Sequence, residues 1–270
     1  MILDGHIHIF EEKGDSKKLL DDMKQAGVDG GILISIPPDW FGAETEGMSS
    51  EARLDSLMGW TAGSDNLYPF YWIDPMEDDK LDQIDMAVER GVKGFKIICH
   101  DYLPWEDECV DTLTAIAEAG KPVLFHSGIV WANAWSEYSR PVHFEQLFAI
   151  DNLRFSMAHI SWPWYDEMIA VYGKWQWEKR TGRTKAELFI DLTPGTPPMY
   201  RRDALTKLYT LGYDVKNNVF FGTDSLTAPY NIDCTKEWID RDNAIYHDLG
   251  LDEEMIKGIY SKNLLRFIEG

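Results

Sequence analysis

Short apolar runs alternate along this chain with longer stretches in which apolar residues recur at helical spacing. Each run is apolar at successive positions, which is typical of a strand that is buried on both faces of a parallel sheet. Glycine, proline and acidic residues separate the runs from the helical stretches. The predicted strands cover residues 2–9, 31–36, 67–74, 94–98, 123–126, 154–159, 188–191 and 219–224.

The stretches between the runs predict helices. Gly27 and Gly120 follow two of these stretches and provide the residue type that often ends a helix. Beyond Asp233 the chain is expected to be helical to its end, with Gly250 and Gly258 as breaks. The predicted helices cover residues 16–25, 50–61, 79–90, 107–119, 143–150, 164–179 and 202–210.

Eight strands alternating with helices indicate an α/β fold with a parallel sheet that is covered by helices. A chain of 270 residues fits a closed (β/α)8 TIM barrel, for which about 250 residues are typical. The alternative is an open doubly wound sheet, but its Gly-x-Gly-x-x-Gly signature is missing after the first strand. No linker or repeat divides the chain, so we expect one domain over residues 1–270.

The first predicted strand carries two histidines two residues apart, His6 and His8. Side chains at positions i and i+2 of a strand point the same way, so both imidazoles can reach one metal ion. The alternative is a pair of core or surface histidines without a ligand. The pair alone does not distinguish a metal site from histidines without a ligand.

Polar residues end several of the predicted strands, which is where parallel barrels place their sites. Four of the seven histidines fall at such positions, and this distribution favours a metal site over scattered surface histidines. Each residue keeps an alternative role: His126 and His159 as hydrogen-bonded core residues, and Asp224 as a cap of the turn that follows it. The residues at strand ends are His6, His8, Asp74, Lys96, His126, His159, Asp191 and Asp224.

Three hypotheses fit Lys96: it pairs with an acidic neighbour, it binds an anionic substrate, or it is carboxylated and bridges two metal ions. His100 shares the strand parity of Lys96 and is a second candidate for substrate binding. We interpret Asp74 and Asp191 as loop groups or as partners of the ligands. His143 and His247 lie in helical sequence and are expected to be structural.

Charge and cysteine content limit the partners. The chain has 26 basic and 46 acidic residues, a net charge of -20, so binding of nucleic acid or anionic membranes is not expected. The expected partner is a small molecule. Three widely spaced cysteines predict reduced thiols. No signal-peptide pattern is present, which predicts a cytoplasmic location, and no long apolar run is present, so we expect no membrane span.

The ordered motifs Asp-Gly-His-Ile-His, Gly-Phe-Lys, Leu-Phe-His, Ala-His-Ile-Ser and Gly-Thr-Asp-Ser, with a closing Lys-Asn-Leu-Leu-Arg-Phe, span the whole chain. In this order they resemble the amidohydrolase superfamily, and within it the amidohydrolase-related (amidohydrolase 2) group of metal-dependent TIM-barrel hydrolases and decarboxylases. The resemblance implies one divalent ion, Zn²⁺ or alternatively Mn²⁺, held by His6, His8, His126 and Asp224. It implies that His159 faces the substrate or, in a two-metal variant, binds a second ion; we favour one ion.

Three imidazoles and one carboxylate leave a coordination position open for water, which is typical of a catalytic site. We therefore expect a metal-dependent hydrolase that opens a small amide, lactone or ester with a metal-activated water. Asp224 would transfer the proton and His159 would orient the water or stabilise the oxyanion.

Two other functions remain open. One is non-oxidative decarboxylation of an aromatic or unsaturated acid, with Lys96, Arg53 or Arg140 binding the carboxylate. The other is a non-catalytic barrel that binds a metal or ligand.

Six tryptophans lie in segments that follow strands, where barrel loops form the pocket. An aromatic pocket suits a planar or cyclic substrate, although each ring has packing against the barrel rim as its alternative. We expect Lys96, His100, Trp131 and Trp162 to bind substrate, and exposed tryptophan-rich loops leave a homodimer open. The six are Trp40, Trp105, Trp131, Trp135, Trp162 and Trp164.

Overall fold

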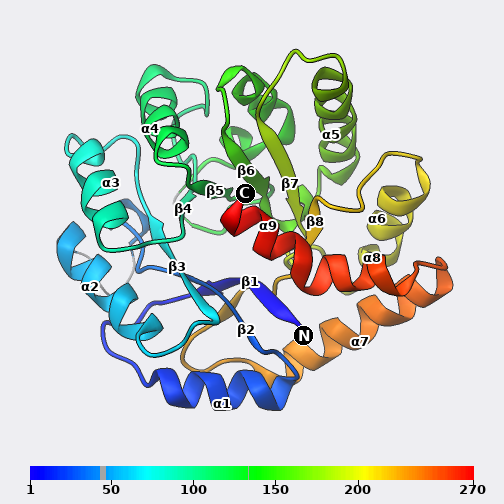
Figure 1. The fold of residues 1–270 in the computed structure, drawn as a ribbon, viewed down its shortest axis with the longest axis horizontal. Coiled ribbons are helices and arrows are strands. Elements are labelled where there is room, and N and C mark those ends of the chain that lie inside the picture. Colours follow the sequence, from blue (N-terminus) through cyan, green and yellow to red (C-terminus); the bar gives the residue numbers. More distant parts are fainter. Residues whose placement is uncertain (43–46, 133) are drawn as a thin grey trace.

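The computed structural model describes residues 1–42, 47–132 and 134–270 and confirms the alternation of strands and helices. All paired strands are parallel, and their order is β8-β7-β6-β5-β4-β3-β2-β1-β9 (Figure 1). The strands are β1 (Leu3–His8), β2 (Gly30–Ile34), β3 (Leu67–Trp72), β4 (Gly94–Ile97), β5 (Pro122–Phe125), β6 (Arg154–Met157), β7 (Glu187–Asp191), β8 (Val219–Phe220) and β9 (Ser225–Leu226).

Of the last predicted strand, 219–224, only residues 219–220 are strand in the structure, and a second short strand follows the predicted run at 225–226. β8 pairs with β7, whereas β9 pairs with β1, so the segment from β8 to β9 joins the two edges of the sheet. The Gly5 N–H donates to the Phe221 carbonyl at 2.9 Å across this seam. Asp224 interrupts the strand because its φ of 60° is left-handed and incompatible with extended backbone. The sheet therefore curls into a TIM barrel, as the pattern predicted.

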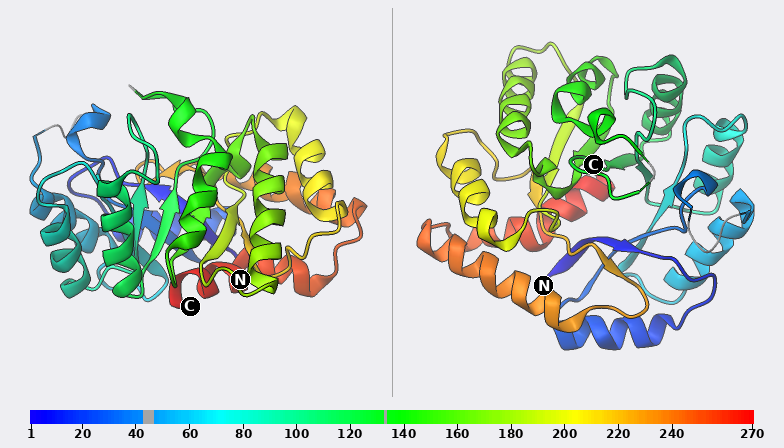
Figure 2. Two further views of the ribbon diagram at one scale, coloured as in Figure 1. Left: turned by 90° about the horizontal axis from the view of Figure 1, so that it is seen from above. Right: turned by 180° about the vertical axis from the view of Figure 1, so that it is seen from behind.

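Helices surround the sheet (Figures 1 and 2). The segment predicted as an α-helix over 143–150 is instead a 3₁₀ helix, η3 (Pro141–Ala149), whose amides bond three residues back, as from His143 to Arg140 at 3.1 Å. The α-helices are α1 (Ser16–Ala26), α2 (Ser50–Thr61), α3 (Lys80–Glu89), α4 (Asp107–Glu118), α5 (Tyr165–Arg180), α6 (Pro198–Thr210), α7 (Ile232–Asp248), α8 (Glu253–Lys257) and α9 (Asn263–Glu269). Shorter turns are η1 (Asp39–Phe41), η2 (Ser136–Ser139), η4 (Ala158–Ser161) and the π turn η5 (Gly258–Lys262).

The C-terminal helix α9 closes one end of the barrel. Its Phe267 ring packs against Phe189 and Phe220, with ring centroids 5.1 and 5.2 Å away. Arg154, at the start of β6, donates to the Phe267 carbonyl at 2.6 Å, so α9 lies at the end where the strands begin. Figure 1 shows α9 across the centre of the barrel. The opposite end, where the strands finish, is left for a site.

Cys99, Cys109 and Cys234 are free thiols, as the sequence predicted. Within residues 1–42, 47–132 and 134–270, no helix combines the length and the apolar character that a membrane crossing requires.

Candidate metal centre

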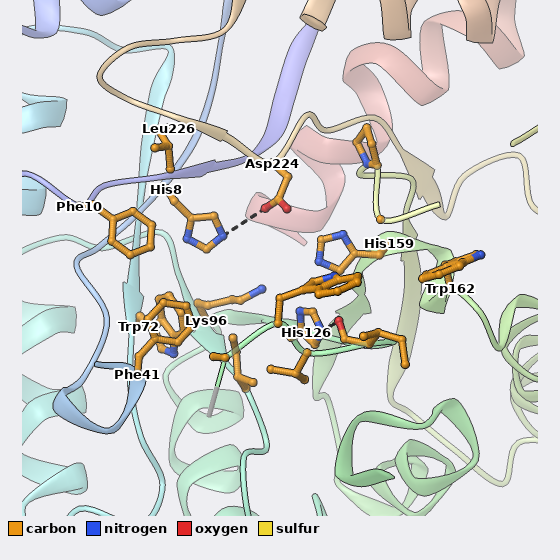
Figure 3. Close-up of a pocket in the computed structure, with 17 residues that line it drawn as sticks. His8, Phe10, Phe41, Trp72, Lys96, His126, His159, Trp162, Asp224 and Leu226 are labelled. Carbon is orange, nitrogen blue, oxygen red and sulfur yellow. Dashed lines mark hydrogen bonds and ion pairs between the residues drawn. The ribbon is translucent and has the colours of Figure 1, made fainter. Parts of the chain in front are cut away.

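A cavity of about 390 Å³ opens at the end of the barrel where the strands finish (Figure 3). Its polar wall consists of five residues that the sequence analysis singled out: His8, Lys96, His126, His159 and Asp224. They come from β1, β4 and the segments that follow β5, β6 and β8. Parallel strands thus bring residues that are far apart in sequence to one rim.

His6 and His8 lie close enough to share one cation. Their Nε2 atoms are 3.1 Å apart, and Asp224 Oδ1 lies 3.6 Å from His6 Nε2 and 3.4 Å from His8 Nε2. Two ring nitrogens and a carboxylate oxygen that converge in this way form a donor set that suits a divalent metal ion. The residues therefore fit the metal that the family resemblance implies.

Asp191 prepares His6 for this role. Its Oδ2 lies 2.8 Å from His6 Nδ1, and its Oδ1 accepts hydrogen bonds from the Thr193 amide, at 2.7 Å, and from the Thr193 hydroxyl. A carboxylate on Nδ1 keeps the proton on that nitrogen and leaves the Nε2 lone pair free. Burial raises the pKa of Asp191 to about 6, against the lowering effects of His159, Lys96 and the bonds from Thr193.

Asp4 holds the segment that carries Asp224, and sequence analysis missed this residue. Its buried carboxylate accepts hydrogen bonds from the Thr223 amide at 2.8 Å, the Tyr230 hydroxyl at 2.9 Å and the Thr223 hydroxyl at 2.5 Å. The Asp224 amide donates to the His6 carbonyl at 3.0 Å. The signal was present in the sequence, because Asp4 precedes His6 by the same interval that separates His6 from His8.

The charge state of Asp224 suits a ligand or a proton acceptor. Loss of water around the carboxyl raises its pKa, but the hydrogen bond from His8 and, at the low pH where these rings are protonated, the charges of His159 and His6 outweigh this effect. The net pKa lies well below the usual range, so the carboxyl is ionised at neutral pH.

His159 follows β6 on backbone that bends sharply into the barrel mouth. His159, Ile160 and Ser161 all have positive φ, at 61°, 43° and 59°, and such strain in non-glycine residues is often found at functional sites. One ring nitrogen of His159, one of His6 and a carboxylate oxygen of Asp224 all lie within 4.8 Å of one another. Burial lowers the pKa of His159, so the ring is neutral at pH 7.

His126 lies next to His159, with ring centroids 4.8 Å apart. Its Nε2 is 3.1 Å from the Ile129 carbonyl, which requires a proton on Nε2 and leaves Nδ1 as its lone-pair nitrogen. Burial, followed by the proximity of the ionisable side chains of His159 and Lys96, lowers its pKa well below the usual range.

Lys96 is buried, with Nζ 3.4 Å from His6 Nε2. Burial lowers the pKa of Lys96 to about 8, although Asp224 and Asp191 oppose the shift. The lysine therefore lies inside the group of metal-binding candidates and is mostly charged at pH 7.

The residues predicted to bind substrate divide into two groups. Lys96, Trp131 and Trp162 line the cavity, and Trp131 stands at its mouth with 86% of its surface exposed. His100 is not among the lining residues, because it stacks on Trp40 at 4.2 Å and places its Nε2 3.3 Å from Asp74 Oδ2. Sequence analysis missed Phe10, Phe41 and Trp72, which also line the cavity.

The two arginines considered for carboxylate binding are engaged elsewhere. Arg53 donates to the Trp72 carbonyl at 2.9 Å from behind the cavity wall. Arg140 donates to Glu167 at 2.7 Å and stacks on Trp164. Trp105 packs against His143, and Trp135 is 75% exposed; like Trp164, neither lines the cavity.

Comparison with known proteins supplies a family match over almost the whole chain. The family model described as Amidohydrolase matches residues 4–268. A comparison with curated proteins finds no match.

Several solved structures share the fold. A TIM-barrel protein of Bordetella bronchiseptica is 14% identical, with a TM-score of 0.70 and coverage of 98% of this chain and 97% of the other. A probable 2-pyrone-4,6-dicarboxylic acid hydrolase of Acinetobacter baumannii is 12% identical, with a TM-score of 0.64 and coverage of 100% and 99%. A dihydroorotase of Campylobacter jejuni is 15% identical, with a TM-score of 0.62 and coverage of 98% and 82%.

Proposed function

The chain belongs to the amidohydrolase family, and we propose that it is a metal-dependent hydrolase that opens a small amide, lactone or ester. The observation that carries the proposal is the convergence of His6, His8 and Asp224 at the polar end of the cavity. We propose one divalent ion, Zn²⁺ with Mn²⁺ as the alternative. His6, His8 and Asp224 would hold it, with Nδ1 of His126 as the further ligand.

A divalent ion in such a site lowers the pKa of a coordinated water towards about 7 and polarises a carbonyl group. The residues of the chain supply the remaining chemistry. Asp224 is ionised and can accept a proton from the attacking water and pass it to the leaving group. His159 is neutral and its ring lines the cavity, where it can face the substrate.

Non-oxidative decarboxylation is the second candidate, and Lys96 is the observation that favours it. Its ammonium lies beside His6, where it could pair with a substrate carboxylate. A non-catalytic barrel is a weaker proposal, because the ligand set, its supporting carboxylate Asp191 and an open cavity occur together.

Metal analysis of purified protein tests the ligand set. We expect near-stoichiometric zinc or manganese in the wild type and its loss in His8→Ala and Asp224→Asn. His247→Ala is the matched control, because this histidine is 91% exposed and outside the cavity. Full metal retention in both ligand variants would contradict the assignment.

A substrate panel then separates the two reactions. We expect zinc-loaded enzyme to open dihydrocoumarin or to cleave aryl esters or anilides, without release of carbon dioxide from hydroxybenzoic acids. Carbon dioxide release without hydrolysis would establish the decarboxylase instead.

A further inference from the structure

Among the described residues, the charged and imidazole side chains that line the cavity gather at one end of it. Lys96, His8, His159 and Asp224 gather at the metal end, and the walls beyond them are formed by Phe10, Phe41, Trp72, Leu226 and Trp162. Figure 3 shows Phe10, Phe41 and Trp72 on one side of the polar group and Trp162 beyond His159 on the other. A ligand that reaches the metal end therefore rests its remaining surface on carbon atoms.

The described lining residues offer positive charge at the metal end and at no other part of the cavity. Among the described residues that line the cavity, Lys96 is the one lysine or arginine. The sequence segments outside the described residues, Ala-Glu-Thr-Glu at 43–46 and Asn at 133, contain no lysine or arginine. Arg53 and Arg140 are engaged by Trp72 and Glu167, as described above.

Trp72 lines the apolar wall without offering it a donor. The side chain is buried, and its indole N–H has no hydrogen-bond partner within the described residues. The nitrogen itself is buried, so a ligand in the cavity does not reach it in this structure. Trp72 therefore contributes no group that could balance a negative charge on a ligand.

We propose that the substrate has one polar reactive head and an apolar body of about ring size that carries no second charge. The identity of the bond that reacts in this head rests on the proposed function, whereas the selectivity for an uncharged apolar body does not. The cavity volume of about 390 Å³ suits a small ring compound. A second carboxylate on the body would be buried without a partner, so we expect it to weaken binding about 100-fold or more.

Binding of simple acids to the zinc-loaded protein tests the proposal by isothermal titration. The probes are acetate, benzoate and benzene-1,4-dicarboxylate. Benzoate should bind at least about tenfold more tightly than acetate, because the ring buries apolar surface, and about 100-fold more tightly than the dicarboxylate. Equal binding of benzoate and the dicarboxylate, or of benzoate and acetate, would overturn the proposal.

Leu226→Arg provides a gain-of-function variant, with Leu226→Gln as the matched uncharged control. Leu226 is 40% exposed, so the barrel can accommodate a longer side chain there. The ratio of dicarboxylate affinity to benzoate affinity should rise at least about tenfold in the arginine variant, whereas the glutamine variant should keep this ratio near the wild-type value. An arginine variant that still discriminates like the wild type would contradict charge as the basis of selectivity.

Turnover separates this proposal from the proposed hydrolase. If no ester, lactone or amide is cleaved but benzoate keeps its advantage, the hydrolase is refuted and the selectivity stands. If dicarboxylate lactones are cleaved as efficiently as neutral ones, the hydrolase stands and the selectivity is refuted.

Discussion

Replacing Asp191 by asparagine should weaken metal binding by changing the proton position on His6. In the wild type, one oxygen of Asp191 faces His6 Nδ1 at 2.8 Å and the other is held by the amide and hydroxyl of Thr193. Because Thr193 supplies two donors, the carbonyl oxygen of an asparagine would stay on that side and its NH₂ group would face His6. A donor at Nδ1 favours the tautomer with the proton on Nε2, and a protonated Nε2 cannot bind a metal.

The size of the effect follows from the position of Asp191 behind His6, a proposed metal ligand. Loss of such a supporting hydrogen bond typically weakens metal affinity about 10–100-fold, or about 1.4–2.7 kcal/mol. His6 and Asp191 are both fully buried, so water cannot replace the lost acceptor, and we expect the upper part of this range. A competition titration of Zn²⁺ against a chromogenic chelator at pH 7.5 measures the change.

Asp22→Asn is the matched control. Asp22 is also buried, but it lies on α1 and pairs with Lys18 at 2.5 Å, away from the cavity. Its zinc affinity should stay within about twofold of the wild type, and circular dichroism should show that both variants are folded. A zinc affinity of Asp191→Asn within twofold of the wild type would refute the tautomer argument.

Three further predictions concern stability. Arg201 and Asp242 form a fully buried ion pair with N–O distances of 2.9 and 2.6 Å. Arg201→Met should therefore lower the free energy of unfolding by about 3–5 kcal/mol, and the double variant Arg201→Met/Asp242→Leu should recover most of this loss. A double variant that is no more stable than Arg201→Met in calorimetry would contradict this prediction. Burial raises the pKa of Glu187, but bonds and charges from Lys179 and Arg266 outweigh it and lower the pKa overall. The folded state therefore favours the ionised carboxylate. The contribution of this carboxylate to stability is complete above its ordinary pKa and is lost as the pH falls below that value. The Tm advantage of the wild type over Glu187→Gln should shrink from pH 6 to pH 3, and a constant advantage would refute this linkage. Removal of metal with a chelator should lower Tm, because a ligand at 100 times its Kd stabilises the folded state by about 2.7 kcal/mol, and an unchanged Tm would argue against a resident ion.

The apolar pattern of the chain was sufficient to predict the barrel. Runs such as 67–74 and 94–98 are apolar at nearly every position, apart from Asp74 and Lys96, because both faces of a barrel strand are covered, and the structure places β3 and β4 there. The same physics predicted where the polar residues would meet. Parallel strands end at one rim, so His8, His126 and Asp224 line one cavity although the chain separates them widely.

Other features depend on contacts that no local pattern encodes. His100 follows β4 and has the same strand parity as Lys96. The stacking of His100 on Trp40 and its contact with Asp74 nevertheless hold it outside the cavity wall. Trp131 and Trp135 both lie in a predicted loop that follows a strand, but Trp131 lines the cavity and Trp135 does not.

The sequence alone therefore determined the fold and the ring of ligand candidates, since both follow from hydrophobic periodicity and strand direction. The tertiary structure decided how those candidates are held. The pairing of β1 with β2 shifts register between Asp4 and Ile7, and Asp4 holds Thr223 across the seam while Asp191 reaches His6 from β7. These hydrogen bonds join residues up to 219 positions apart, and only the closure of the barrel brings their atoms within bonding distance.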